Sequence, residues 1–384
     1  MWKGEVVLEE FIMSTTIYMG EGSFEKIDEL TIKRAFIFCD PFMQQSGKTD
    51  LIVKKLDGLH AEYQIFAEVV PDPNMTVIQK GLNQLNAFRP DTVFALGGGS
   101  AIDTAKAVVY LYAKMHDIER PRVVALPTTS GTGSEVTAFA VISDQEAGVK
   151  YPLIASDMIP DVVLLNPKLT ATVPPAITAD TGMDVFTHGL EAFVSTKAND
   201  FTDAMAEKSI RTVWDYLERC VTDGGDMDAR ARMHNASCMA GMAFNAASLG
   251  ICHSMAHALG AQFHLPHGRC NAVLLPIIIE YNAGIDIPGE SDALLRYLDI
   301  ARLLGITAGT NKATIHLLVR QIRELMVRIG IPVHFEGLKI DGDNFLRSID
   351  IMAENALKDR CTVTNPRVPT VEHIRQLYRK LYQA

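Results

Sequence analysis

The sequence predicts a protein in two parts: an α/β part at residues 1–175, built on a Rossmann-like parallel sheet, and an all-helical part at residues 176–384. Three observations lead to this prediction. Short apolar runs alternate with amphipathic segments in the first part, apolar residues recur at spacings of three and four in the second, and prolines punctuate the join. The length of 384 residues agrees, because a domain typically has roughly 100–200 residues.

Four segments of the first part are short, nearly continuous apolar runs: residues 34–39, 92–96, 122–126 and 161–165. Such runs are typical of strands that are buried on both faces of a parallel sheet. Amphipathic segments at 76–88 and 101–115 lie between them and predict helices. The alternation of strands and helices predicts a layered α/β fold with right-handed crossovers.

The second part has long segments of helical periodicity and almost no strand-like runs. The expected helices are residues 179–195, 202–220, 229–245, 292–304 and 312–329. The join carries Asn166-Pro167 and Pro174-Pro175. A cleft between two domains is a common place for a ligand, so we expect the functional site there.

Composition limits the classes of partner. Lys and Arg number 36 against 46 Asp and Glu, a net charge of −10 that disfavours nucleic acids and anionic membranes as partners. The six cysteines form no CxxC pair and predict reduced thiols. The N-terminal residues lack a signal-peptide pattern, and the apolar run at 272–279 is too short to span a bilayer. We therefore expect a soluble cytoplasmic protein.

Two loops have the composition of phosphate-binding loops. The run at 92–96 leads into Gly97, Gly98 and Gly99, and Ser100 is expected to cap the helix that follows. Free amides at a helix N-terminus suit a pyrophosphate, although a tight strand-to-helix turn would also use these glycines. The second loop, PTTSGTGSE at 127–135, follows the next strand. Two such loops at the carboxyl ends of neighbouring parallel strands predict a nucleotide site.

Asp40 stands at the end of the first predicted strand, after the apolar run at residues 34–39, and precedes Pro41. A carboxylate here would accept hydrogen bonds from the ribose hydroxyls of NAD and repel the 2′-phosphate of NADP. A turn-forming aspartate is the alternative interpretation. The common G-x-G-x-x-G fingerprint is absent from the sequence.

A cluster of aspartate and histidines in the second part predicts a metal site. Asp184 and His188 stand at i and i+4 on one helix face, and four histidines fall within residues 253–267. Buried imidazoles and carboxylates need a partner, and one divalent cation would satisfy several of them at once. The oxygen and nitrogen donors suit Fe²⁺, Zn²⁺ or Mn²⁺, and we expect an open coordination position facing the cleft.

These segments resemble the motifs of the iron-containing (group III) alcohol dehydrogenases, whose fold is of the dehydroquinate synthase-like type. The matching motifs, in the family's order, are GGGSAIDTAK, PTTSGTGSE, ITADTGMDVFTHGLEAFVS and GICHSMAHALGAQFHLPHG. The resemblance extends from about residue 16 to the C-terminus. Within the family the chain is most similar to the 1-propanol dehydrogenases of propanediol utilisation, through PDVVLLNPKLTATVPPAIT, DFTDAMAEK, MHNAS and AGMAF.

The resemblance implies roles for individual residues. It implies four metal ligands, Asp184, His188, His253 and His267, and a proton relay through His257. It implies NAD(H)-binding roles for Gly97, Gly98, Gly99, Ser100 and Asp103 at the pyrophosphate, Thr128, Thr129, Ser134 and Lys150 near the nicotinamide, Asp40 at the ribose, and Asp72 in the loop that lines the adenosine. It implies no role for His264, which we expect at the surface.

The implied activity is the reversible, NADH-dependent reduction of short-chain aldehydes such as propanal and ethanal to primary alcohols. Iron is the implied metal, with zinc as the alternative, and a homodimer or larger homo-oligomer, associated with a bacterial microcompartment, is the implied assembly. Asp180 stands where several relatives have an uncharged residue, and we expect it to be exposed to solvent. We expect three aromatic residues, Phe139, Phe244 and Phe263, to line the substrate pocket.

Several alternatives stay open at this point. An alcohol dehydrogenase of ethanolamine or diol metabolism would carry the same motifs, and glycerol dehydrogenases have fewer histidines in their metal motif. A dehydroquinate synthase-like lyase would need basic residues for a phosphorylated acid, for which Lys150 and Arg269 are the nearest candidates. A non-enzymatic component of a metabolic compartment would retain the fold without needing the metal ligands.

Overall fold

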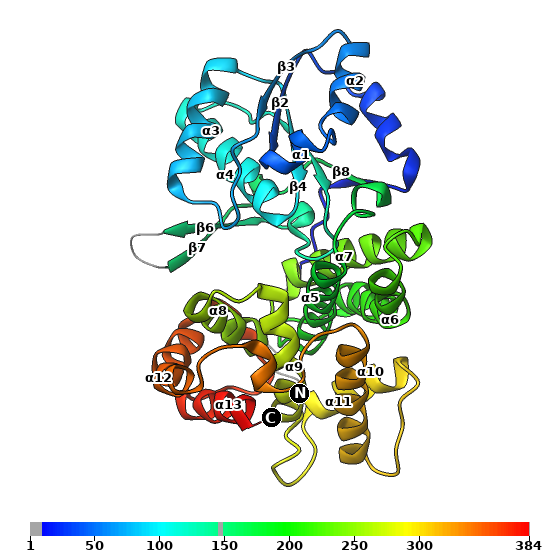
Figure 1. Ribbon diagram of the computed structural model, residues 1–384, viewed down its shortest axis with the longest axis vertical. Coiled ribbons are helices and arrows are strands. Elements are labelled where there is room, and N and C mark those ends of the chain that lie inside the picture. Colours follow the sequence, from blue (N-terminus) through cyan, green and yellow to red (C-terminus); the bar gives the residue numbers. More distant parts are fainter. Residues whose placement is uncertain (1–9, 145–148, 384) are drawn as a thin grey trace, which may run out of the picture.

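The computed structural model describes residues 10–144 and 149–383, and its first half is built on a six-stranded parallel sheet (Figure 1). The strand order is β1-β8-β5-β4-β2-β3. The strands are β1 (Thr16–Met19), β2 (Arg34–Cys39), β3 (Glu62–Phe66), β4 (Thr92–Gly97), β5 (Arg122–Pro127) and β8 (Val162–Leu165). The four predicted strands are confirmed, and the two strands of this sheet that were not predicted are its edge strands, β1 and β3.

Helices cover both faces of this sheet, which explains why its central strands β2, β4 and β5 have no polar side chain after their first residue. In β2, Phe36 and Phe38 pack in one core with α3 and α4, whereas Ile37 and Cys39 pack in another with α2. The helices of this half are α1 (Pro41–Gln45), α2 (Asp50–Gly58), α3 (Met75–Phe88) and α4 (Gly99–His116). Period-two alternation is therefore absent because each side chain is buried whichever face it points to.

The order in which strands are added to the sheet reverses between β2 and β4. From β4 the chain continues to β5 on one side, while β2 and β3 lie on the other. Ligands of open α/β sheets bind outside the carboxyl ends of the strands at such a switch point. The chain after β2 leads to α2 on one face of the sheet, and the chain after β4 leads to α4 on the other face.

Helix α4 begins earlier than the sequence analysis predicts. Its first residue is Gly99, and Gly98 occupies the N-cap position without a side-chain hydrogen bond. Ser100 therefore lies inside the first turn, and its expected capping role is wrong. The first amides of any helix have no intrahelical partner, and Gly98 at the N-cap has no side chain to accept a hydrogen bond from them.

An antiparallel hairpin projects from the sheet-bearing half (Figure 1). It consists of β6 (Phe139–Asp144) and β7 (Val149–Ile154), and it packs against α4. This hairpin was not predicted from the sequence. Residues 145–148 and the side chains of residues 144–150 lie outside the described part, so the predicted role of Lys150 is not visible.

The second half is helical, as predicted (Figure 1). Its helices are α5 (Pro175–Val194), α6 (Asp200–Thr222), α7 (Met227–Ala247), α8 (Ile251–Phe263), α9 (His267–Ala283), α10 (Asp292–Leu303), α11 (Asn311–Arg328), α12 (Gly342–Lys358) and α13 (Val371–Gln383). Helix α5 packs against α6, α7 and α9, which buries it on most sides. The division into domains at residue 175 stays a prediction.

Helix α7 joins the two halves. The Ser130 hydroxyl lies 3.1 Å from His234 Nδ1, and the Ala138 amide donates to Asn245 Oδ1 at 2.9 Å. Both contacts link loops that follow β5 to side chains of α7. The loop after β5 is therefore held against the helical half.

All six cysteines are buried and unpaired, in agreement with the expected reduced thiols. Burial raises the pKa of the Cys39 and Cys220 thiols to about 12. Within the described ranges, none of the helices has the length and apolar composition needed to cross a membrane. The expectation that the N-terminal residues are not a signal peptide concerns a segment of which residues 1–9 lie outside the described part.

Candidate metal centre and coenzyme loops

Three of the four predicted metal ligands converge in the helical half. Asp184 and His188 come from α5 and His253 from α8, and one donor atom of each lies within 4.8 Å of the other two. None of the three is more than 4% exposed. The i, i+4 spacing on α5 brings the first two together, and packing adds the third.

The donor atoms of this cluster fit a cation. His188 Nδ1 and His253 Nε2 are buried and have no hydrogen-bond partner among the described residues. His253 Nε2 lies 3.7 Å from Asp184 Oδ1. Unpaired buried polar atoms are costly, so a divalent cation between one carboxylate and these imidazoles would satisfy them together.

The pKa shifts of Asp184 and His188 keep a carboxylate and a neutral imidazole available for a cation. Burial alone would raise the pKa of Asp184, but the surrounding histidines His188, His267 and His253 hold it far below its usual range. Burial lowers the pKa of His188 to about 4, so this imidazole is neutral at pH 7 and has a free lone pair. Burial also opposes the charging of His253, yet Asp184 and Glu191 raise its pKa to about 9. Asp184 and Glu191 thus create a negative electrostatic potential at His253, which favours a bound proton or cation there.

His267, the fourth predicted ligand, stands beside the cluster but is not part of it. Its Nε2 lies 3.5 Å from Asp184 Oδ1 and 3.1 Å from Asn271 Nδ2. Asn271 also donates to Asp184 Oδ1 at 2.7 Å and so connects the two residues. The His267 side chain is 40% exposed, so the cluster is open to solvent on this side. Its role as a ligand stays a prediction.

His257 lies on the same open side. Its ring stacks on that of His267 at a centroid distance of 5.2 Å, and its side chain is 43% exposed. His257 Nδ1 bonds to Asp359 Oδ2 at 2.8 Å, while the other Asp359 oxygen accepts the Cys361 amide. Burial would raise the pKa of Asp359, but His257 and the Cys361 amide lower it to about 2. His264, by contrast, is exposed at the end of α8, as expected.

Asp180 is not exposed, contrary to expectation. It is 8% exposed, and Arg269 donates to its two oxygens at 2.9 and 3.1 Å. Helix α9 packs against α5, and this brings the first turn of α9 to the carboxylate one turn before Asp184. The charge of Arg269 is therefore neutralised within the protein.

Two of the three predicted aromatic residues lie at the site. Phe244 stacks on the ring of His188 at 4.5 Å, and Phe139 lies 5.9 Å from Phe244. Phe263 stacks on Phe345 and packs against the helical core, so its place in the substrate pocket stays a prediction. It is the last residue of α8 and lies two turns beyond the histidines.

The two predicted coenzyme loops are bonded to each other. The Thr128 amide donates to the Gly97 carbonyl at 2.9 Å. Asp40 accepts the Met43 amide at 3.0 Å and caps α1, which is a local structural role, and its role at the ribose stays a prediction. Asp72 lies in the exposed loop before α3. The loops carry the predicted residues Gly97, Gly98, Gly99, Ser100, Thr128 and Thr129.

A buried lysine supports these loops. Lys106, on α4, is 1% exposed and donates to the Ser134 carbonyl at 2.9 Å and to Thr137 Oγ1 at 3.2 Å. Burial lowers the pKa of Lys106 to about 8. Asp103 accepts hydrogen bonds from the Ser134 hydroxyl and the Val141 amide, so both of its oxygens are engaged within the protein.

The loop after β5 also touches the metal helix. A Cβ added at Gly131 would lie 2.8 Å from the Cβ of Thr181, which is on α5 one turn before Asp184. Only glycine allows this approach. The predicted nucleotide loop and the metal cluster are therefore adjacent.

Three residues of the site escaped the sequence analysis: Glu191, Asn271 and Asp359. Glu191 follows His188 by three positions, and Asn271 follows His267 by four, so helical spacing was a usable signal for both. Asp359 is 102 residues from His257, and no local pattern links them.

Comparison with known proteins agrees with this geometry. Residues 14–167 match the family model "Iron-containing alcohol dehydrogenase", and residues 178–382 match "Fe-containing alcohol dehydrogenase family, C-terminal". The chain is 43% identical over 378 residues to a 1-propanol dehydrogenase of Citrobacter freundii, covering 97% of this chain and 100% of that protein.

Solved structures show the same fold. An iron-containing alcohol dehydrogenase from Thermococcus thioreducens is 35% identical with a TM-score of 0.88, covering 97% of this chain and 100% of its own. A sulfoacetaldehyde reductase from Bifidobacterium kashiwanohense, solved in complex with NAD⁺, is 26% identical with a TM-score of 0.86, covering 98% and 99%. The chain belongs to the iron-containing alcohol dehydrogenase family.

Proposed function

We propose that this protein is a metal-dependent alcohol dehydrogenase that reduces short-chain aldehydes such as propanal and ethanal with NADH, reversibly. The observation that carries the proposal is the convergence of Asp184, His188 and His253, with unpaired donor atoms, beside a glycine- and threonine-rich loop of the sheet. The 1-propanol dehydrogenase of Citrobacter freundii supports the substrate class.

The bound cation would supply Lewis-acid polarisation of the aldehyde oxygen, and the nicotinamide would donate the hydride. Asp184, His188, His253 and His267 would hold the cation. His257 would move the proton: its Nδ1 is bonded to Asp359, so Nε2 is the atom that can exchange a proton with the substrate oxygen or with water. Phe244 and Phe139 would provide apolar walls that exclude water from the site.

The coenzyme would lie across the carboxyl ends of β2, β4 and β5. The free amides at the start of α4 would bind the pyrophosphate. Asp40 would accept the ribose hydroxyls, and Asp72 would line the adenosine. Thr128, Thr129 and Lys150 would approach the nicotinamide half, while Asp103, Ser134 and Lys106 hold the loop in place.

The finer assignments belong to the same proposal. Fe²⁺ is the favoured metal because of the family, and Zn²⁺ suits the same donors. We further propose a homodimer or larger homo-oligomer in the cytoplasm, associated with a bacterial microcompartment, because the motifs resemble those of propanediol-utilisation enzymes. The charge of −10 supports a small-molecule substrate over a nucleic acid.

The lyase alternative is disfavoured by one contact. A phosphorylated acidic substrate would need unpaired basic groups near the metal. Arg269 is one of the two candidates, and both oxygens of Asp180 already engage it. The alternative dehydrogenases of ethanolamine or diol metabolism differ only in substrate. Steady-state kinetics with a series of aldehydes distinguishes them from the proposed activity.

The activity is tested by NADH oxidation. Purified protein loaded with Fe²⁺ or Zn²⁺ is expected to consume NADH on addition of propanal or ethanal, and treatment with a chelator should abolish the reaction because the Lewis acid is lost. The absorbance of NADH is followed over aldehydes of two to four carbons. A metal-loaded protein that leaves NADH unchanged with all of them contradicts the proposed function.

Asp40 is expected to set the preference for NADH over NADPH. In Asp40→Ser the hydroxyl can still accept the Met43 amide, but the charge that repels a 2′-phosphate is gone. We expect the ratio of kcat/KM for NADH to that for NADPH to fall about tenfold or more, since 1.4 kcal/mol is a factor of ten. Asp40→Ala serves as the comparison, because it loses the helix cap as well, worth about 1 kcal/mol of stability. An unchanged coenzyme ratio in both variants would remove Asp40 from the ribose site.

A further inference from the structure

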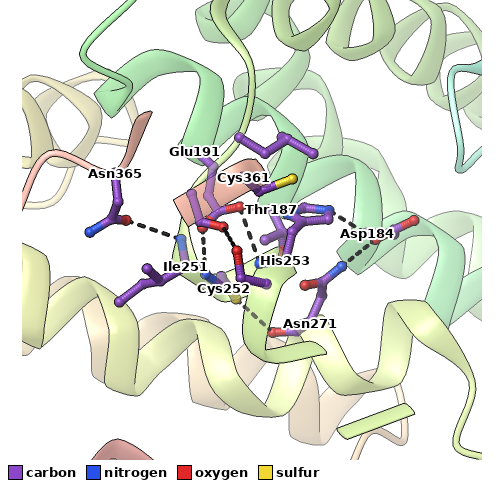
Figure 2. A network of polar contacts seen from close by, with 12 residues as sticks. Asp184, Thr187, Glu191, Ile251, Cys252, His253, Asn271, Cys361 and Asn365 are labelled. Atoms are coloured by element: carbon purple, nitrogen blue, oxygen red, sulfur yellow. Dashed lines mark hydrogen bonds and ion pairs between the residues drawn. The ribbon is translucent and has the colours of Figure 1, made fainter. Parts of the chain in front are cut away.

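Glu191 lies on the same face of α5 as two metal ligands. It follows His188 by three positions and Asp184 by seven, so the three side chains stand above one another. Glu191 is 2% exposed. Its Oε2 lies 2.5 Å from His253 Nδ1, and Figure 2 shows His253 between Glu191 and Asp184. A buried carboxylate therefore engages the ring nitrogen that faces away from the cluster.

The same carboxylate fixes the start of α8. Glu191 Oε1 accepts the Cys252 amide at 2.7 Å, and the N-cap residue Gly250 has no side chain to do so. A Cβ added at Gly250 would lie 2.7 Å from Glu191 Oε1, so the glycine makes room for the carboxylate. Glu191 thus holds both the backbone from which His253 projects and the ring of His253.

This arrangement selects one form of the imidazole. A carboxylate accepts hydrogen bonds only, so His253 Nδ1 must carry the hydrogen. In the neutral imidazole, Nε2 is then the nitrogen with a free lone pair, and it is the buried atom without a partner that faces Asp184. A carboxylate on the outer nitrogen of a ligating histidine fixes its orientation and makes it a better donor.

We propose that Glu191 is a positioning residue of the metal centre, which holds His253 in the orientation and tautomer that bind the cation. The inference rests on the metal site proposed above. Glu191 itself does not coordinate the cation: its two oxygens are engaged by His253 and by the amides of α8.

Asn365 offers a matched control. Its Oδ1 accepts the Ile251 amide at 3.1 Å, so it supports the same end of α8. The Asn365 side chain also bonds to Asn282 and to the Arg367 carbonyl, and none of these bonds involves His253. Loss of Asn365 should therefore weaken the helix start without changing the imidazole.

The test measures the affinity of the apoprotein for Co²⁺ by competition with a chromophoric chelator, together with the visible spectrum of bound Co²⁺. In Glu191→Gln the amide oxygen can still accept the Cys252 amide, while its NH₂ group favours a His253 Nδ1 without hydrogen. We expect affinity to fall about 10–100-fold, with a changed spectrum. Asn365→Ala should keep the wild-type affinity and spectrum and show only a lower Tm.

Wild-type affinity and spectrum in Glu191→Gln would overturn the inference. If that variant does not fold, as judged by circular dichroism, Glu191→Asp is measured instead; its shorter side chain retracts from Nδ1, and unchanged Co²⁺ affinity there would overturn the inference equally. An equal loss of affinity in Asn365→Ala would also overturn it, because helix placement alone would explain the result. Failure of the wild-type protein to bind Co²⁺ would instead contradict the proposed metal site.

Discussion

Asp184→Ala is expected to release the bound metal and to lower kcat with propanal by ~10³-fold, because the Lewis acid contributes several kcal/mol to the transition state and each 1.4 kcal/mol is a factor of ten. Asp184 is the carboxylate at the centre of the cluster: His253, His267 and Asn271 all approach its Oδ1. Without it, three imidazoles would share the cation with no negative charge beside them. Metal content by mass spectrometry and steady-state kinetics give the two readouts.

Asp200→Ala is the matched control for this prediction. Asp200 is the first residue of α6 and is exposed, so the same change of side chain occurs outside the cluster. It should leave both metal content and kcat at wild-type values. Full metal occupancy in Asp184→Ala would show that the cation, if bound, lies elsewhere.

His267→Ala and His257→Ala are expected to separate metal binding from proton transfer. The first should lose metal and activity together, because His267 completes the ligand set. The second should retain metal while kcat falls about 10²–10⁴-fold, the usual contribution of a positioned acid or base. The two rings stack on each other and are similarly exposed, so each variant is a steric control for the other.

Two outcomes would revise these roles. Retention of metal in His267→Ala would limit the ligands to the three residues that the structure brings together. Loss of metal in His257→Ala would make His257 a ligand, and its bond to Asp359 would then orient a coordinating ring. Metal content distinguishes these cases before any rate is measured.

Local composition predicts the central strands of the sheet, because strands buried on both faces are nearly continuous apolar runs. Strands such as β4 and β5 meet that condition and were predicted. The edge strand β3 did not, since Glu62 and Tyr63 are exposed, and the hairpin β6–β7 lies outside the sheet. Pairing partners decide whether such segments become strands, and a single sequence does not contain that information.

Prediction of the site was limited in the same way. Asp184 and His188 share a helix turn, and their spacing revealed them. The bond between His257 and Asp359 depends on how η6 (Arg360–Thr364) and the end of α12 pack against α8. The expectation for Asp180 failed because its partner, Arg269, lies 89 residues away. Pairing of charges across helices is a property of packing, which local spacing does not report.

The six buried thiols can serve as probes of local unfolding. Cys39 lies in the sheet and the other five lie in the helical half, so the two halves carry separate reporters. A thiol reagent reaches such sulfurs only when the surrounding elements separate, and the rate of modification then measures local unfolding. Cys252, next to His253, would report the stability of the metal-binding helix within the intact chain.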